Sequence, residues 1–146
     1  MSDRNLTHLK NMIKYCQDIL DLQMNFGGKS FTSFMLNKGY QYSVSFCIEQ
    51  IGELAKKLRE GGFAAKYPYV EWDQIVGMRN RIAHGYDVLD LEMVYDIATE
   101  DIPKLLEMCQ DMLEQEKSLQ TKIEEAGKQA ELPVRCKSED REEKTR

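Results

Sequence analysis

The feature that most constrains the fold is a stripe of apolar residues that recurs every three or four positions. Its members are Val44, Cys47, Ile48, Ile51, Leu54, Ala55 and Leu58. Residues with this spacing share one face of a helix, so the stripe predicts an amphipathic α-helix that must bury that face against other elements. The pair Gly61-Gly62 follows directly and predicts the end of the helix.

The same periodicity recurs on both sides of this segment. A first helix, ended by Gly27-Gly28, is predicted by Leu6, Leu9, Ile13, Cys16, Leu20 and Met24. A helical turn after Ser30 is expected to point Phe31, Phe34 and Met35 inward. A helix capped by Asp90 carries Met93, Val94 and Ile97, and beyond Pro103 the apolar face continues through Leu105, Leu106, Cys109, Met112 and Leu113. No strand pattern competes, so we expect an all-α fold, an antiparallel bundle of four or five helices.

Length and composition predict one domain followed by a tail. A chain of 146 residues is the ordinary size for a single hydrophobic core. From about Gln129 the sequence is charged, interrupted by proline and poor in apolar residues, which is typical of disorder. We therefore expect a helical domain over residues 1–128 and a disordered tail over residues 129–146.

Neither a targeting segment nor a membrane span is predicted. The chain does not start with an apolar run behind a basic segment, and no window approaches the length of a membrane-spanning helix, so we expect a cytoplasmic protein. The four cysteines, Cys16, Cys47, Cys109 and Cys136, are scattered singly. This spacing suits neither a metal site nor a disulfide framework, and three of them are expected to be buried thiols.

Residues 78–86 read Met-Arg-Asn-Arg-Ile-Ala-His-Gly-Tyr and place one of only two histidines beside two arginines, an asparagine and a tyrosine. Imidazole can move a proton at neutral pH, guanidinium can neutralise a phosphate, and a tyrosine hydroxyl can itself be modified. These are the components of a small RNA-cutting site. The alternative is structural: Arg79 pairs with a helix carboxylate, and His84 only caps its own helix.

The net charge of −5 does not favour binding to nucleic acid, whose affinity comes mainly from cationic contacts with phosphates. The local balance differs. Between residues 56 and 81 six basic residues face three acidic ones (Glu60, Glu71 and Asp73), a local charge of +3; the basic residues are Lys56, Lys57, Arg59, Lys66, Arg79 and Arg81. A two-fold dimer would double this patch, although Lys56, Lys57 and Arg59 could equally be ordinary solvated side chains.

We expect the motif helix to run from about Trp72 to about His84, with Ile75, Met78 and Ile82 as its core residues. Arg79 then lies on the core side with its stem partly buried. His84 lies about 140° from Arg79 around the axis. Either the helix unwinds before Gly85 or a second subunit completes the arrangement.

The same helix gives roles to the neighbouring residues. Asn80 is one turn before His84 and is expected to orient its ring, while Arg81 could supply another phosphate contact. Gly85 is predicted to be the C-cap, which places His84 in the last turn, where the helix dipole favours the imidazolium form.

Arg79, four residues, His84, one residue and Tyr86 resemble the motif of the HEPN superfamily, and more closely of its HepT-like toxins, small proteins encoded beside a minimal nucleotidyltransferase antitoxin. Residues 48–58 resemble the family's helix with an Ile-Gly-Glu-Ala run, and residues 100–106 resemble its acidic-Pro-Leu segment. A proline usual before Trp72 is here Glu71. The resemblance spans about residues 45 to 115.

The resemblance implies a dimeric, HEPN-like bundle that acts as a ribonuclease toxin without a cofactor. It places Arg79 and His84 in the catalytic site, and Asn80 and Arg81 are the supporting residues. The mechanism we infer needs no metal: the ribose 2′-hydroxyl attacks the adjacent phosphate, His84 relays a proton, and Arg79 stabilises the phosphorane.

The resemblance also implies that the antitoxin silences the toxin by transferring AMP to Tyr86. An added phosphate would compete for Arg79 and place negative charge where the RNA phosphate must bind. The alternative is a core or interface tyrosine. A different class of function also stays open, a noncatalytic helical module that binds a nucleotide or the partner enzyme.

Overall fold

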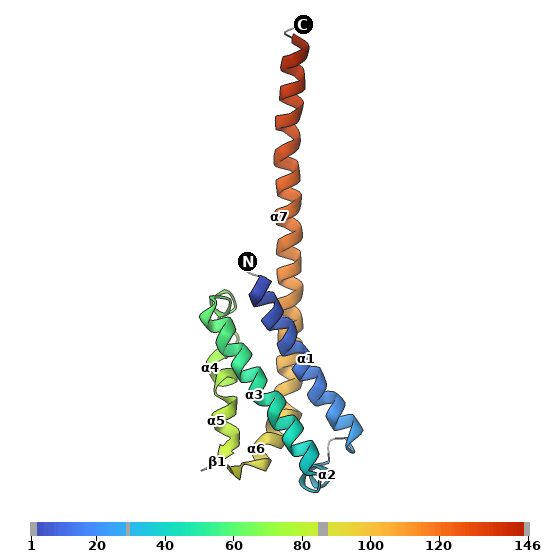
Figure 1. Cartoon of the computed structure of the whole chain (residues 1–146), viewed down its shortest axis with the longest axis vertical. Helices are drawn as coiled ribbons and strands as arrows, with labels where there is room; N and C mark the ends of the chain where they lie inside the picture. The colour runs from blue at the N-terminus through green and yellow to red at the C-terminus, as the bar shows by residue number, and fades with distance from the viewer. Residues whose placement is uncertain (1–2, 29, 85–87, 145–146) are drawn as a thin grey trace. The chain divides into compact units, whose positions relative to one another are not determined.

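A computed structural model of the chain describes residues 3–28, 30–84 and 88–144, with side chains over 4–28, 30–83 and 88–129. The elements, in chain order, are α1 (Asp3–Asn25), α2 (Phe31–Met35), α3 (Lys38–Glu60), the 3-10 turn η1 (Ala64–Lys66), α4 (Trp72–Val76), α5 (Met78–Ile82), β1 (Ala83–His84), β2 (Val88–Leu89), α6 (Leu91–Asp96), the π-helical turn η2 (Ile97–Asp101) and α7 (Ile102–Lys144) (Figure 1). The predicted all-α class is confirmed, with one two-residue strand pair added.

The chain divides into two compact units, Met1–Leu113 and Glu114–Arg146. The first holds the helical bundle and the second holds the rest of α7. The backbone of residues 129–144 continues α7. The disordered tail expected from residue 129 stays a prediction. Among the described residues, no helix combines the length and the apolar character that crossing a membrane requires.

Helix α3 is the centre of the first unit. It contacts α1, α2, α4, α5, α6 and η1, and every residue of the predicted apolar stripe is buried. Asn37 caps its start by accepting a hydrogen bond from the Tyr40 amide at 2.9 Å. The helix ends at Gly61-Gly62, as predicted, and Gly62 adopts a positive φ of 81° that L side chains rarely take.

Helix α1 packs along α3 and buries Leu9, Ile13 and Cys16, as predicted. The prediction for Met24 is wrong, because this side chain is 81% exposed. Each step of four residues turns a helical position by about 40°, so Met24 has moved about 80° from Cys16. Gln23 takes the inward position and is only 4% exposed.

Helix α2 follows Ser30, whose hydroxyl accepts a hydrogen bond from the Ser33 amide at 3.2 Å. Phe34 is buried, as predicted, but Phe31 and Met35 are 39% and 43% exposed. The helix is only five residues long and lies on the bundle surface, so one side of it suffices to cover the core.

The turn η2 sits between α6 and α7 and explains why Gln23 is buried. The Ile102 amide donates to the Ile97 carbonyl, five residues back, and Pro103 has no amide hydrogen to donate. The Ala98 carbonyl accepts a hydrogen bond from Nε2 of Gln23 at 3.0 Å. A side chain of α1 thereby satisfies a buried carbonyl that the helix itself leaves without its usual partner.

Three cysteines belong to the core. Cys16, Cys47 and Cys109 are free and buried, as expected. Burial raises the pKa of Cys47 to about 11 and that of Cys109 to about 12. Burial likewise raises the pKa of Cys16. These thiols are therefore protonated at neutral pH and act as small apolar side chains.

We predict that Gln23→Leu destabilises the first unit although it adds apolar surface. The substitution leaves the buried Ala98 carbonyl unsatisfied, which costs about 1–3 kcal/mol. Urea unfolding followed by circular dichroism measures the change. Gln17→Leu on the exposed side of α1 is the matched control and should stay within about 0.5 kcal/mol of the parent; equal effects of both substitutions would contradict the role given to Gln23.

Candidate functional site

The segment that carries the sequence motif is two short helices rather than the single helix predicted over residues 72–84. Helices α4 and α5 are separated by Gly77, whose φ is −79° and whose ψ of −4° departs from the α-helical value of about −42°. The Gly77 amide still donates to the Asp73 carbonyl at 3.0 Å, and its carbonyl accepts from the Arg81 amide at 3.1 Å. Glycine has low helix propensity, so the helix breaks at this residue.

Helix α3 fixes the position of this segment through a close backbone contact. A Cβ atom on Gly52 would lie 3.4 Å from the carbonyl oxygens of both Ile75 and Val76. Trp72 anchors the start of α4, because its side chain is buried and its Nε1 donates to the Tyr67 carbonyl at 3.0 Å. The motif segment is thus held against the core just before it reaches Arg79.

We predict that Gly52→Val lowers the melting temperature of the protein. The two methyl groups of valine have no room beside the carbonyls of α4, and overpacking of this kind costs about 1–3 kcal/mol. Differential scanning calorimetry measures the shift. Gly127→Val is the matched control, because a Cβ on this helical glycine meets nothing within 4 Å; a similar loss in both variants would contradict the role given to the contact between Gly52 and α4.

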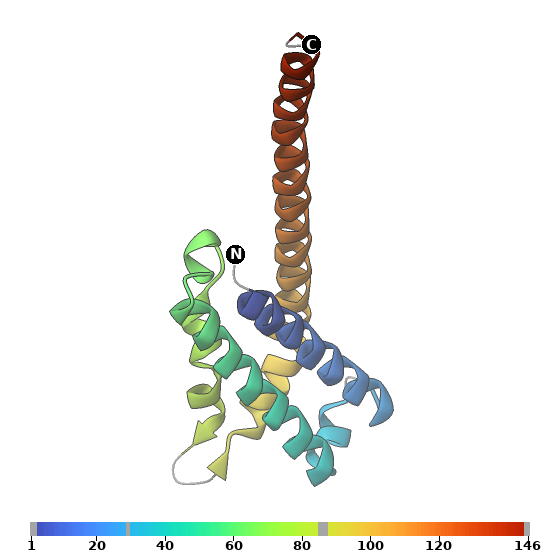
Figure 2. The same ribbon diagram turned by 45° about the horizontal axis from the view of Figure 1, so that its top comes forward.

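Helix α5 ends at Ile82, two residues before the position predicted. Ala83 is extended, with φ −82° and ψ 126°. It pairs with Leu89, and His84 pairs with Val88 in the antiparallel β1–β2 ladder (Figure 2). The Asp90 amide extends the ladder with a 2.7 Å hydrogen bond to the Ile82 carbonyl.

The prediction that His84 lies in the last turn of a helix is therefore wrong, because α5 ends at Ile82 and its C-cap is Ala83. The predicted effect of the helix dipole on His84 loses its basis, and Gly85, the predicted C-cap, lies outside the described residues. The helix unwinds before Gly85, which was one of the two arrangements expected. The helix ends because Ala83 and His84 pair with Leu89 and Val88 in a hairpin. This pairing satisfies backbone hydrogen-bonding groups that a further helical turn would have used.

The side chains of α5 divide into two sets. Met78 and Ile82 are buried in the core, as predicted, whereas Arg79, Asn80 and Arg81 are exposed. The predicted partial burial of Arg79 is thus wrong. Within the described part of the chain we find no ion pair or side-chain hydrogen bond for Arg79, so its cationic head faces solvent close in sequence to the strand of His84.

The predicted contact between Asn80 and His84 rested on a continuous helix and loses that basis. Asn80 lies on α5 and His84 on β1. The His84 side chain lies outside the described part, as do Gly85, Tyr86 and Asp87, so the expected role of Tyr86 falls on residues for which the structure gives no placement. These residues connect two paired strand ends, His84 and Val88.

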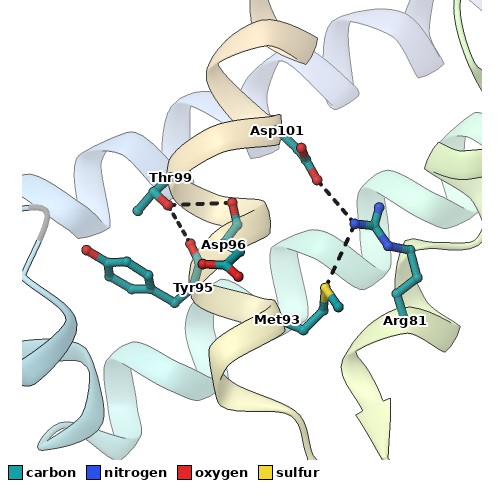
Figure 3. A network of polar contacts seen from close by, with 6 residues as sticks. All are labelled: Arg81, Met93, Tyr95, Asp96, Thr99 and Asp101. Atoms are coloured by element: carbon teal, nitrogen blue, oxygen red, sulfur yellow. Dashed lines mark hydrogen bonds and ion pairs between the residues drawn. The ribbon is translucent and has the colours of Figure 1, made fainter.

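Arg81 has partners that the sequence analysis did not identify. Its Nη2 lies 3.5 Å from Oδ2 of Asp101 and 3.9 Å from the sulfur of Met93 (Figure 3). An unbroken α-helix would separate Met93 and Asp101 by about 80° around its axis. The π turn accommodates one more residue per turn and reduces this angle, so both side chains reach the same guanidinium group. The acidic residue before Pro103 was the only signal for this contact.

Ion pairs also modify the predicted basic patch. Arg59 pairs with Asp73 at 2.5 Å, and Arg81 pairs with Asp101 at 3.5 Å. Both pairs are exposed enough to contribute little to stability. They nevertheless reduce the positive charge available to a phosphate. Of the two motif arginines, Arg81 has an ion pair, whereas no acidic side chain among the described residues forms one with Arg79.

Sequence comparisons identify a family and individual proteins that are similar to the chain. The family described as "HepT-like: Ribonuclease HepT-like" matches residues 10–112. A protein of Methanocaldococcus jannaschii named "Putative RNase MJ1216" is 31% identical over 97 residues, which is 66% of this chain and 77% of that protein. "Putative RNase MJ0125" of the same organism is 30% identical over 97 residues, 66% of this chain and 80% of that protein.

A third relative has a more specific name. "Probable ribonuclease HepT" of Thermococcus cleftensis is 31% identical over 75 residues, which is 51% of this chain and 67% of that protein. No solved structure matches the chain. The matched residues 10–112 begin within α1, include the whole motif segment and end near Leu113, where the first compact unit ends.

Proposed function

Because the chain belongs to the Ribonuclease HepT-like family, we propose that it is an endoribonuclease and the toxin of a toxin–antitoxin pair. The family match across residues 10–112 is the observation that carries the proposal. The motif residues Arg79, His84 and Tyr86 are all present. The names of two relatives, a putative RNase and a probable ribonuclease, support the ribonuclease activity.

The proposed reaction is cleavage of RNA by its own 2′-hydroxyl group. The 2′-oxygen attacks the adjacent phosphorus, the bond to the 5′-oxygen of the next nucleotide breaks, and the products are a 2′,3′-cyclic phosphate and a free 5′-hydroxyl. His84 takes up and returns the proton, and Arg79 stabilises the charge on the phosphorane. Neither step requires a metal ion or a cofactor.

The two proposed catalytic residues lie on different elements, Arg79 on α5 and His84 on β1. Arg79 lies on the exposed side of α5, and His84 lies on β1 after the chain has left the helix. A strand holds its residues in a different direction from a helix, so the 140° separation expected in one continuous helix does not apply. In the homodimer that we propose, a second copy would bring another Arg79 and His84 to the same cleft.

We predict that purified, unmodified protein cuts total cellular RNA in the presence of chelator, and that Arg79→Ala and His84→Ala reduce the rate by at least about 100-fold, as expected for loss of a general acid–base or charge-stabilising group. Gel electrophoresis follows the RNA, and phosphatase-resistant 3′ ends reveal the cyclic phosphate. Intact mass on the same preparation verifies that Tyr86 carries no added group.

The chain offers matched controls for both catalytic variants. Lys14→Ala removes an exposed cationic side chain of α1, outside the basic patch, and His8→Ala removes the other histidine. Both should cut RNA at the parent rate. Cleavage of an all-deoxy strand, or loss of cleavage in chelator, would contradict the proposed chemistry.

We further propose that a minimal nucleotidyltransferase neutralises the protein at Tyr86. The tyrosine oxygen attacks the α-phosphorus of ATP, AMP is transferred and pyrophosphate leaves. The adduct adds a phosphate two residues from His84, where it competes with RNA for Arg79.

For this step we expect a mass gain of at least one AMP when the protein is incubated with such an enzyme, ATP and magnesium, together with loss of RNA cleavage. Tyr86→Phe should gain no AMP and should remain active under the same conditions. Tyr42→Phe changes an exposed tyrosine elsewhere and should be modified like the parent. AMP on the Tyr86→Phe variant would exclude Tyr86 as the only acceptor.

A second function, a noncatalytic module that binds a nucleotide or its partner enzyme, is favoured by one observation. Arg81 is held by Asp101, so one of the two motif arginines is engaged within the chain. Unmodified protein that leaves RNA intact would favour this second function.

A further inference from the structure

A hollow of about 360 Å³ lies in the first unit beside α5, between the segment 69–81 and the segment 101–108. Its volume is in the range of sites for small molecules. It contains Arg81, the motif arginine that Asp101 holds. The hollow thus lies beside α5, the helix that also carries Arg79.

The base of the hollow is apolar. Ile75, Met78 and Leu105 line it, and each is at most 5% exposed, so packing in the core holds these side chains in place. Met108 adds a flexible thioether side chain to the same lining. A flat apolar ring can cover this surface and remove it from water.

The rim carries an aromatic ring and hydrogen-bonding groups. Tyr69 is 61% exposed, while Tyr67, against which it packs edge-on at 6.1 Å, is buried. The buried ring closes the bundle, and the exposed ring is available for stacking. The amide of Gln74 and the carboxylate of Glu71 stand on the same rim and can pair with the edge of a base.

Three charged residues line the hollow around Asp101, and Glu71 on the rim adds a fourth charge. Arg81 and Lys104 are cationic, and Asp101 is acidic. The Arg81–Asp101 contact is 3.5 Å long, and its side chains are 38% and 40% exposed. Such a pair is weak, so a phosphate with two or three oxygens can replace Asp101 as the partner of Arg81.

We propose that this hollow is a subsite for one nucleobase of the RNA strand. Tyr69 stacks on the base, Gln74 and Glu71 contact its edge, and Arg81 with Lys104 holds the attached phosphate. Aromatic stacking combined with cationic contacts is how proteins bind unpaired nucleotides. The inference rests on the proposed RNA cleavage and adds to it the group that selects where the strand is cut.

The test is an NMR titration of the full chain with each of the four ribonucleoside 3′-monophosphates. We expect shifts of backbone amides in residues 69–81 and 101–108, with one base bound more tightly than the others. Tyr69→Ala should weaken binding roughly 5- to 150-fold, the loss expected for one stacked base. Gln74→Ala should reduce the preference between bases more than it reduces affinity.

Tyr42→Ala is the matched control, since Tyr42 is 62% exposed but lies on α3, outside the hollow. It should bind nucleotides like the parent. Both tyrosines are on the surface, so neither substitution should unfold the protein, and circular dichroism verifies this. Equal affinity of Tyr69→Ala and Tyr42→Ala, or shifts confined to other residues, would overturn the subsite.

An RNA cleavage assay on the same variants separates the two proposals. If the parent cuts RNA but Tyr69→Ala keeps its rate, cut positions and nucleotide affinity, the subsite fails and the nuclease stands. If the parent leaves RNA intact yet nucleotides bind in the hollow and depend on Tyr69, the nuclease fails and the subsite stands.

Discussion

The burial of α3 on several faces is the constraint on which the rest of the structure depends. Its apolar stripe meets α1, while its other contacts hold α4, α5 and α6. Gly52 allows the carbonyls of Ile75 and Val76 to approach the helix backbone. The position of Arg79, three residues beyond Val76, is therefore determined by a contact that contains no functional residue.

The π turn η2 links the core to the candidate site. Toward α1, Gln23 satisfies the Ala98 carbonyl, and toward α5, Asp101 contacts Arg81. The extra residue in the turn creates both interactions, because it disturbs the hydrogen-bond ladder and rotates Asp101 toward α5. The single turn η2 thus contacts both α1 and the motif helix α5.

Periodicity in the sequence predicted the elements whose position is set by burial, such as α3. Local chemistry predicted the cap at Asp90, whose side chain accepts a hydrogen bond from the Met93 amide at 3.1 Å. The sequence pattern could not predict where α5 ends, because that depends on pairing between Ile82 and Asp90 across the hairpin. Nor could it predict the partner of Arg81, since Asp101 is 20 residues away in sequence. The roles of Arg79, His84 and Tyr86 rest on the motif and the proposed chemistry.

The pairing of His84 with Val88 makes the length of the intervening chain a property of the site. Successive residues of a strand point to opposite faces, so a register shift of one position reverses the direction of every side chain in the strand. An insertion or deletion between His84 and Val88 that shifted this register by one position would place residue 84 on the opposite face of the strand pair. The motif therefore depends on the register of this hairpin as well as on the identity of its residues.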